Sequence, residues 1–408
     1  MTESIAASGS DADRETRRGA HDGPPSAPTR LIALDVLRGI AILGTLATNV
    51  WILTNAEGLV GYLSQVSATG SGWAWVERVL QQLVQGKFLG LLTVMFGIGL
   101  AIQQGSATRG GRRWPGKYPV RAGLLLLDGT LNFLFVAEYD VLMGYAVTGL
   151  VVAYLLARSE RAQRRWLVVT ASIHVAILTL IAVALAMQPK TDRPRGGPLR
   201  PNPYAEGSFW DLVVFRAQHV AIFRLETVFI FAMSIALFLV GARLYRAGVF
   251  RPEGALLRRR LMMIGFGIAA PIDLIAGIAG GGDMILFTRY GTAPFVSLGI
   301  LALGASWYLR RPHPGFVGRR LTEVGRTALS CYILQNLVAS TLCYGWGFGL
   351  ASRVSPDTPD TYVAFTVGVF LTTSALIMLA AHLWLRRFAR GPVEWLWHTS
   401  YRAVTRER

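Results

Sequence analysis

Long apolar runs constrain this chain more strongly than any motif. A helix rises 1.5 Å per residue, so about 20 apolar residues cross the roughly 30 Å hydrocarbon layer of a membrane. Ten stretches of the 408 residues meet this requirement. We therefore predict an all-α fold, a polytopic membrane helix bundle of about ten transmembrane helices, with spans near residues 31–54, 87–105, 120–137, 140–157, 166–187, 224–246, 261–280, 290–309, 327–350 and 362–385.

The positions of the basic residues orient these spans. If the N-terminus is inside and the spans alternate, the inner segments carry 30 of the 41 Lys and Arg residues and the outer segments carry 10, while Arg38 lies within the first span. Positive charge is retained on the cytoplasmic side during insertion, so both termini are predicted to be cytoplasmic. Arginine outnumbers lysine 38 to three, a bias typical of GC-rich bacterial genomes. The predicted location is the plasma membrane of a bacterium, with multiple passes.

The net charge of +17 raises the question of a nucleic-acid partner, because basic clusters neutralise phosphates. The arginines lie in short loops beside apolar spans, however, and no stretch resembles a separate basic module. Anionic headgroups on the cytoplasmic side are the expected counter-charge, worth about 1 kcal/mol per nearby Lys or Arg. We therefore predict membrane lipids as partners and no nucleic acid. The sequence leaves the oligomeric state open.

The two cysteines, Cys331 and Cys343, lie on one predicted helix. Their separation of twelve residues corresponds to roughly 18 Å along that helix, which is too far for a disulfide bond. Neither a disulfide framework nor a zinc site is supported, and no metal ligands are predicted.

The spans divide the chain into two halves joined by one long loop. The apolar run at 31–54 is too long for the core of a signal peptide, so we expect a retained helix. The loop at 55–86, which contains Trp73 and Trp75, is expected to lie at the outer interface as a short amphipathic segment. The predicted organisation is a disordered cytoplasmic tail (1–30), an N-terminal five-helix half (31–187), an outer loop with an interfacial helix at SFWDLVVFRAQHVAIF (188–223), a C-terminal five-helix half (224–390) and a cytoplasmic tail (391–408).

Charged residues inside spans are the strongest functional signal, because burial of one in hydrocarbon costs at least about 2.5–3.5 kcal/mol. In the first span Asp35, Arg38, Thr45 and Asn49 share a face within about 80°. Asp35 and Arg38 are three residues apart and can form an ion pair. That pair is either a structural anchor at the inner boundary or part of a ligand site, and both interpretations stay open.

Asp128 lies near the middle of the third span, with Asn132 one turn later on the same face. A carboxylate at that depth is either protonated or matched to a basic partner. Structural pairing and proton handling are both consistent with its position.

A second group of polar residues falls in the predicted outer half. Helix ends at a membrane surface are ordinarily charged, so each of these residues alone has a structural explanation. His219 is the outer histidine and the obvious general base at neutral pH. Candidate catalytic residues are therefore His219, Asp140 and Glu226. The wider outer group also contains Glu138, Arg224, Asp273, Asp283 and Arg289.

Four strings resemble a known bacterial membrane family. They are LDVLRGIAILGTLATN at 34–49, KFLGLLTVMFGIGLA at 87–101, GRTALSCYILQN at 325–336 and GPVEWLWH at 391–398. In this order they are similar to domain of unknown function 418, the YeiB-like proteins, and they extend over nearly the whole chain after residue 30. The LDVLRG string also resembles, more distantly, the beginning of polytopic membrane acyltransferases, which move an acyl group from a cytoplasmic donor to an acceptor often on the other face.

This chain departs from the family pattern at several positions. Asn132 stands where family members commonly have histidine, and Ser330 with Cys331 replaces a Thr-Asn pair. The acetyltransferase relatives use a histidine after the first span, and residues 55–86 contain none. If acyl transfer occurs, its base must therefore come from elsewhere.

Three functions remain after these observations. The first is a membrane acyltransferase acting on a lipid-linked, envelope or small-molecule acceptor, with acyl-CoA as a possible donor. The second is a transporter or flippase that uses Asp128 and the Asp35–Arg38 pair. The third is a non-catalytic membrane protein. Predicted substrate-binding or donor-binding residues are Asp35, Arg38, Asn49, Asp128, Asn132, Arg224, Asp273 and Arg326.

Overall fold

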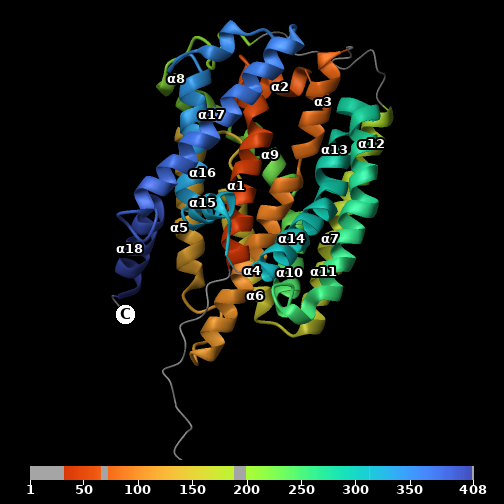
Figure 1. The fold of residues 1–408 in the computed structure, drawn as a ribbon, viewed down its shortest axis with the longest axis vertical. Helices are drawn as coiled ribbons and strands as arrows, with labels where there is room; N and C mark the ends of the chain where they lie inside the picture. Colours follow the sequence, from red (N-terminus) through yellow and green to blue (C-terminus); the bar gives the residue numbers. More distant parts are fainter. Residues whose placement is uncertain (1–31, 66–71, 188–198, 312, 407–408) are drawn as a thin grey trace, which may run out of the picture. The chain divides into compact units, whose positions relative to one another are not determined.

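A computed structural model describes residues 32–65, 72–187, 199–311 and 313–406. The predicted disordered tail at 1–30 lies outside the described residues, as does part of the 188–223 loop. The described residues contain helices and no strand, which confirms the all-α prediction. The α-helices are α1 Ile32–Leu53, α2 Gly58–Gln65, α3 Trp73–Val84, α4 Lys87–Arg109, α5 Tyr118–Phe135, α6 Leu142–Leu156, α7 Glu160–Met187, α8 Phe209–Gln218, α9 Val220–Phe229, α10 Phe231–Arg246, α11 Ala255–Met262, α12 Ala270–Gly280, α13 Ile285–Phe287, α14 Ala293–Arg310, α15 Phe316–Arg326, α16 Ala328–Cys343, α17 Pro359–Leu385 and α18 Pro392–Arg406 (Figure 1).

Shorter 3-10 and π-helical turns connect some of these helices. They are η1 Pro252–Gly254, η2 Met263–Ala269, η3 Gly281–Met284, η4 Thr288–Thr292 and η5 Leu350–Arg353. Two of them, η2 and η4, are π-helical turns within the α11–α14 region.

Several helices are long and apolar enough to cross a membrane. Among the described residues there are five such stretches, and a sixth if α9 and α10, which are bent by 45°, form one span. In α7 only 11% of the most apolar window is buried within the protein. Exposing so much apolar surface to water is unfavourable, so this helix is suited to contact lipid. The five stretches are Ile32–Leu53, Trp73–Arg109, Glu160–Met187, Pro252–Arg310 and Pro359–Leu385.

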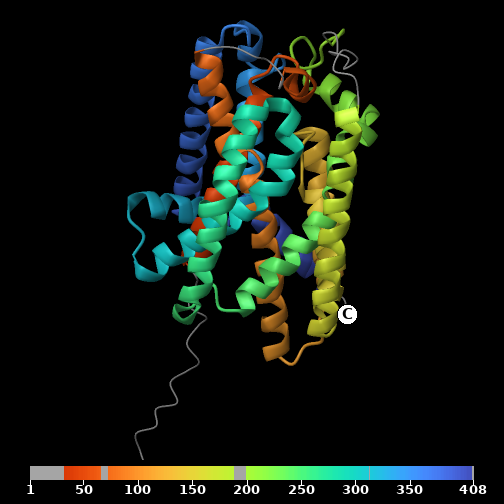
Figure 2. The same cartoon turned by 90° about the vertical axis from the view of Figure 1, so that its right-hand side faces the viewer.

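The helical stretch Pro252–Arg310 contains two of the predicted spans. At 59 residues it would be about 90 Å long if it were straight, roughly three times the hydrocarbon thickness. Instead the chain reverses near Gly281, whose φ of 53° lies in the left-handed region, and α14 packs back against α11 and η2 (Figure 2). The reversal falls between the predicted spans at 261–280 and 290–309. A count of ten spans stays a prediction.

The two loops that were predicted to lie at the membrane interface both contain helical segments. In the 55–86 loop, α3 begins at Trp73 and continues into α4 across Gly86, and it packs against α12 and α17. In the 188–223 loop, the SFWDLVVF segment forms α8, with a capping box between Ser208 and Asp211. Hydrogen bonds from Ser208 lower the pKa of the exposed Asp211 carboxyl, which favours a charged group at this helix N-terminus.

Helix α1 is largely buried, and it packs against α4, α14, α15, α16 and α17. Its glycines allow these close approaches. A Cβ atom at Gly39 would coincide with the Leu321 carbonyl oxygen of α15, and one at Gly44 would collide with the ring of Phe88. Conversely, Gly325 of α15 lies against the carbonyl of Asp35. The LDVLRG string is thereby fixed against α15 by backbone-to-backbone contact.

Candidate functional site

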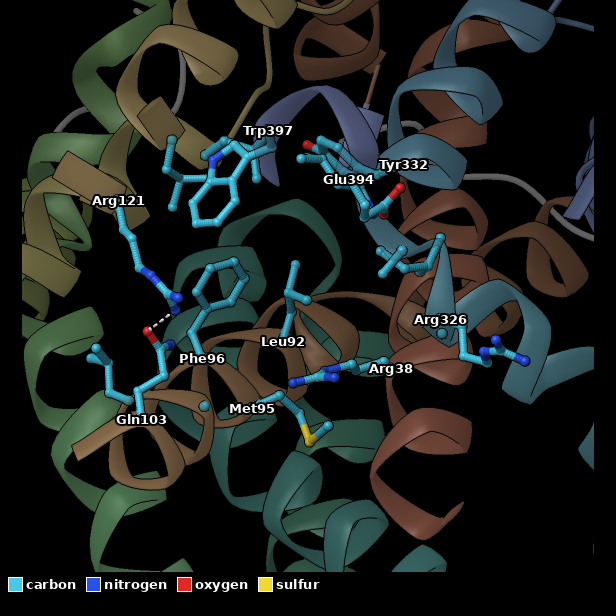
Figure 3. Close-up of a pocket in the computed structure, with 18 of the residues that line it drawn as sticks. Arg38, Leu92, Met95, Phe96, Gln103, Arg121, Arg326, Tyr332, Glu394 and Trp397 are labelled. Carbon is cyan, nitrogen blue, oxygen red and sulfur yellow. Dashed lines mark hydrogen bonds between the residues drawn. The ribbon is translucent and has the colours of Figure 1, made fainter. Parts of the chain in front are cut away.

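A cavity of about 400 Å³ lies where α1, α4, α5, α15, α16 and α18 meet (Figure 3). Its walls combine apolar side chains with aromatic rings and a small number of charged groups. The lining residues are Arg38, Ile42, Leu92, Met95, Phe96, Gly99, Leu100, Gln103, Tyr118, Arg121, Leu125, Leu142, Gly325, Arg326, Ala328, Leu329, Tyr332, Glu394 and Trp397. We call it the inner cavity, because Arg121 and Arg326 belong to segments that the charge distribution predicts to be cytoplasmic, and Arg38 lies near the predicted cytoplasmic end of the first span.

The four strings that carry the family resemblance converge on the inner cavity. Of its 19 lining residues, 14 come from residues 34–49, 87–101, 325–336 and 391–398. These segments lie far apart in the sequence, and only the fold brings them together. The shared strings are therefore concentrated around one space rather than spread over the bundle.

Three arginines and one carboxylate supply the charge of the inner cavity. Arg121 donates to Gln103 over 2.6 Å (Figure 3). Its guanidinium lies over the rings of Trp397 and Tyr401, at 5.6 and 4.8 Å from the ring centroids. Arg326 donates to the Ala389 carbonyl, while its buried Nε has no partner among the described residues. Such a mixture of cations, rings and apolar walls is suited to a ligand with an anionic head and an apolar part.

The predicted pairing of Asp35 with Arg38 is present in the structure. Arg38 Nη1 lies 3.7 Å from Asp35 Oδ1, and Asp35 is buried whereas 36% of the Arg38 side chain remains exposed. The aspartate therefore positions the arginine at the cavity wall. A role for the two residues in ligand binding stays a prediction.

Glu394 is a site residue that the sequence reasoning did not select. Its carboxylate accepts hydrogen bonds from the backbone N–H groups of Leu329 and Ser330 at 2.8 and 3.2 Å, and also from the Ser330 hydroxyl. Helix α18 thereby caps the first turn of α16, where four N–H groups lack helical partners. In the GPVEWLWH string this glutamate follows Gly391 by three residues. The structure shows that a Cβ atom at Gly391 would collide with the Glu394 carboxylate and the Ser330 hydroxyl.

Asp128 and Asn132, which were expected to share a face, have different surroundings. Asn132 donates to Asp140 over 2.7 Å, so it belongs to the group between α5 and α6. Asp128 is half-buried, and its Oδ2 atom has no hydrogen-bond partner among the described residues. The structure therefore joins Asn132 to the outer group and leaves the role of Asp128 open.

A buried ion pair joins the loop between α5 and α6 to helix α8. Arg216 Nε lies 3.1 Å from Glu138 Oε2, and Tyr204 donates to the other oxygen of Glu138 over 3.0 Å. Burial and the Glu138 charge raise the pKa of Tyr204 well above its ordinary value, so this phenol remains a donor. Arg224 donates to the backbone carbonyls of Glu138 and Asp140. Glu138, Arg216 and Arg224 therefore each have a partner within the protein, which gives their presence a structural explanation.

Two further ion pairs hold Glu226 and Asp273. Glu226 accepts hydrogen bonds from Arg289 at 2.9 Å and Tyr290 at 2.7 Å. Asp273 is fully buried between Lys87, Gln82 and Thr292. Buried carboxylates are retained when they are paired in this way.

The three predicted catalytic residues are not joined by direct hydrogen bonds within the described part of the chain. Nδ1 of His219 lies 2.8 Å from the Phe215 carbonyl oxygen, and its ring packs on that of Phe215. Asp140 instead accepts from Asn132 and the backbone of Leu142, and Glu226 is bound to Arg289. Their catalytic roles remain predictions, and Glu226 lines a second cavity.

That second cavity is small, about 30 Å³, which is enough for roughly two water molecules. It is lined by Thr45, Thr48, Asn49, Gly86, Leu89, Tyr139, Val141, Glu226, Arg289 and Tyr332. We call it the outer cavity. Tyr332 of α16, which is 2% exposed, contributes to the walls of both cavities. One buried side chain therefore lies between the cluster of arginines and the Glu226–Arg289 pair.

The described residues contain no group of three or more His, Cys, Asp or Glu side chains that could hold a metal ion. Cys331 and Cys343 are both buried, and neither is part of a disulfide.

Comparison with known proteins confirms the family resemblance. Residues 244–403 match the family model described as protein of unknown function (DUF418). The chain is 25% identical over 402 residues to the uncharacterized protein YxaH of Bacillus subtilis (strain 168), which covers 91% of this chain and 94% of the relative. It is 27% identical over 390 residues to the uncharacterized protein YeiB of Escherichia coli (strain K12), covering 90% of this chain and 95% of the relative.

Proposed function

We propose that this chain is a bacterial plasma-membrane protein with ten spans and cytoplasmic termini, and that it transfers an acyl group from a donor bound in the inner cavity. The relatives YxaH and YeiB, which come from bacteria, match nearly the whole chain. The apolar helices support a location in the membrane. The acceptor is a lipid-linked, envelope or small-molecule compound carrying a nucleophile.

The inner cavity is the observation that carries this proposal. An activated acyl donor such as acyl-CoA combines phosphates with an apolar chain. Arg38, Arg121 and Arg326 match the phosphates, because guanidinium groups bind phosphate oxygens in a bidentate manner. Leu92, Phe96 and the neighbouring apolar side chains match the acyl chain. The strings that resemble the family supply most of this lining.

The outer cavity supplies a place for the acceptor side of the reaction. In acyl transfer the acceptor oxygen or nitrogen attacks the acyl carbonyl carbon, its proton passes to a base, and the thiolate of the donor leaves. Glu226 faces the outer cavity, with Arg289 beside it to position the carboxylate. His219 and Asp140 are the alternative bases. Displacement of the Tyr332 side chain would connect an acyl chain in the inner cavity with Glu226 in the outer cavity.

A transfer assay tests the proposal directly. Purified protein is incubated with radiolabelled acyl-CoA and extracted bacterial lipids, and products are separated chromatographically. We expect transfer by the wild type and a loss of at least about tenfold in Arg38→Gln, since a hydrogen bond to a charged group contributes about 1.5–3 kcal/mol.

The matched control is Arg319→Gln, an exposed arginine on α15 outside the inner cavity. It should transfer at the wild-type rate. Absence of both transfer and acyl-enzyme across several chain lengths would refute the acyltransferase proposal.

Transport is a second candidate, favoured by one observation. Asp128 is a half-buried carboxylate within α5, and its Oδ2 atom lacks a hydrogen-bond partner among the described residues. A group of this kind can bind and release a proton during transport. In sealed vesicles, a proton-coupled flippase would show substrate movement that depends on a pH gradient and is abolished by Asp128→Asn. Unchanged movement in that variant would exclude this role of Asp128.

A further inference from the structure

A hollow of about 350 Å³ lies on α18, apart from the residues that line the inner cavity. It is lined by Arg390, Trp395, His398, Thr399, Arg402 and Ala403. None of these residues appears in the lining of the inner cavity, although both spaces use the same helix. We call this the α18 hollow.

The α18 hollow has positive charge and no matching anion. Its described lining contains two arginines and no carboxylate, and neither Arg390 nor Arg402 forms an ion pair among the described residues. The buried Nε2 atom of His398 also lacks a hydrogen-bond partner there. Burial, together with the charges of Arg390 and Arg402, lowers the pKa of His398. The site therefore offers donors for an anion.

The surroundings of the hollow are typical of a membrane surface. Trp395 and Leu396 of α18 are 60% and 57% exposed, and indole rings favour the level of the lipid headgroups. Trp384, at the end of the apolar helix α17, donates to the Arg390 carbonyl oxygen over 2.8 Å. The arginines thus lie beyond the end of a helix that is long and apolar enough to cross a membrane.

The same helix contacts the inner cavity through its other side chains. Glu394 and Trp397 line that cavity, and Glu394 caps α16. Arg121 of α5 lies over Trp397 and Tyr401, and Lys117 donates to the Thr405 carbonyl oxygen. Whatever orders α18 therefore also orders one wall of the inner cavity.

We propose that the α18 hollow binds the phosphate of an anionic phospholipid through Arg390 and Arg402, and that the bound lipid holds α18 in place against α5 and α16. A membrane lipid is favoured over free phosphate because exposed Trp395 and Leu396 stand beside the cationic groups and can contact acyl chains. The proposal does not depend on acyl transfer, since it concerns a different set of residues.

Lipid retention tests the binding part. Delipidated full-length protein is reconstituted with phosphatidylglycerol or phosphatidylcholine, and bound lipid is counted by native mass spectrometry. Each nearby arginine contributes about 1 kcal/mol toward an anionic lipid, so Arg390→Gln/Arg402→Gln should bind phosphatidylglycerol about 30-fold more weakly. The double lysine variant should retain most of the binding. The control Arg319→Gln should behave as wild type.

Two results would overturn the binding part. One is equal retention of phosphatidylglycerol by the wild type and the double glutamine variant. The other is complete displacement of the lipid by millimolar inorganic phosphate, which would show a phosphate site instead. Size-exclusion chromatography and melting temperature establish that the variant is folded before either result is interpreted.

Hydrogen exchange tests the ordering part. Backbone amides of α18 and of Leu329 and Ser330 should exchange more slowly in phosphatidylglycerol than in phosphatidylcholine nanodiscs, and the double glutamine variant should lose this difference. Identical exchange in the two lipids would contradict the ordering of α18 by the lipid.

Discussion

Glu394 joins two parts of the chain through a single carboxylate. Its partners Leu329 and Ser330 lie 65 and 64 residues away in sequence. The carboxylate satisfies two N–H groups at the start of α16 and one hydroxyl, and its negative charge is favourable at a helix N-terminus. One side chain thus closes the wall of the inner cavity and stabilises the helix that separates the two cavities.

Removal of this carboxylate should destabilise the protein. Glu394→Ala leaves two partly buried N–H groups and the Ser330 hydroxyl without their acceptor, and we expect a loss of about 2–3 kcal/mol. Glu394→Gln retains one acceptor oxygen and should lose less. Thermal unfolding in detergent measures the melting temperatures, which should decrease from the wild type to Glu394→Gln and then to Glu394→Ala.

The control for this change is Glu253→Ala, because Glu253 is exposed and no hydrogen bond of its side chain is seen in the described structure. Its melting temperature should equal that of the wild type. A melting temperature of Glu394→Ala within error of the wild type would show that the cap contributes nothing.

Single residues differ in how far the sequence could predict them. The Asp35–Arg38 pair was predictable, because residues three apart on a helix are neighbours whatever the tertiary structure. Glu394 and Arg121 were not, because their partners lie on other helices and follow from packing alone. The sequence also suggested His219 as a base, but a residue type does not specify its surroundings, and the structure places its ring on Phe215.

At the level of elements, close contact between α1 and α15 positions two of the three arginines of the inner cavity, Arg38 and Arg326. Gly39 follows Arg38, and Gly325 precedes Arg326. Because each glycine lies against backbone atoms of the other helix, neither arginine can shift without separating the helices.

A methyl group at Gly39 should therefore disturb both stability and binding. Gly39→Ala forces a Cβ atom onto the backbone of Leu321, and overpacking of this kind costs about 1–3 kcal/mol. We expect a lower melting temperature and weaker binding of acyl-CoA or another anionic amphiphile. Differential scanning fluorimetry and a binding titration on the same sample check both effects.

Gly123→Ala provides the matched control, since a Cβ atom at Gly123 of α5 would meet open space. Alanine is the better helix former by up to about 1 kcal/mol, so this variant should be as stable as the wild type or slightly more stable. Equal behaviour of the two alanine variants would rule out close α1–α15 packing as the cause.

The helices themselves were largely predictable, whereas their junctions were not. Apolar runs specify helices because a backbone in hydrocarbon must satisfy its own hydrogen bonds. Such runs do not show that α3 continues into α4 across Gly86, or that α18 folds back onto α16. These features depend on a left-handed glycine and on a capping carboxylate, which leave no periodic pattern in the sequence.

For the whole molecule, the orientation predicted from the distribution of basic residues is consistent with the arginines that line the inner cavity. The positive-inside rule predicts that Arg38 lies near the cytoplasmic end of the first span and that Arg121 and Arg326 belong to cytoplasmic segments. The inner cavity collects these three arginines with Glu394 of α18. An orientation derived from sequence alone therefore assigns the inner cavity to the side on which acyl-CoA is made.

Cysteine labelling tests that orientation. Ser355 and Arg319 are both exposed, and ten spans place them on opposite sides, Ser355 outside and Arg319 inside. The native Cys331 and Cys343 are buried, so the background should be low. In intact cells a membrane-impermeant maleimide should label Ser355→Cys fully and Arg319→Cys only after permeabilisation. Labelling of both variants from outside, or of Arg319→Cys alone, would contradict the predicted topology and move the inner cavity away from the cytoplasmic donor.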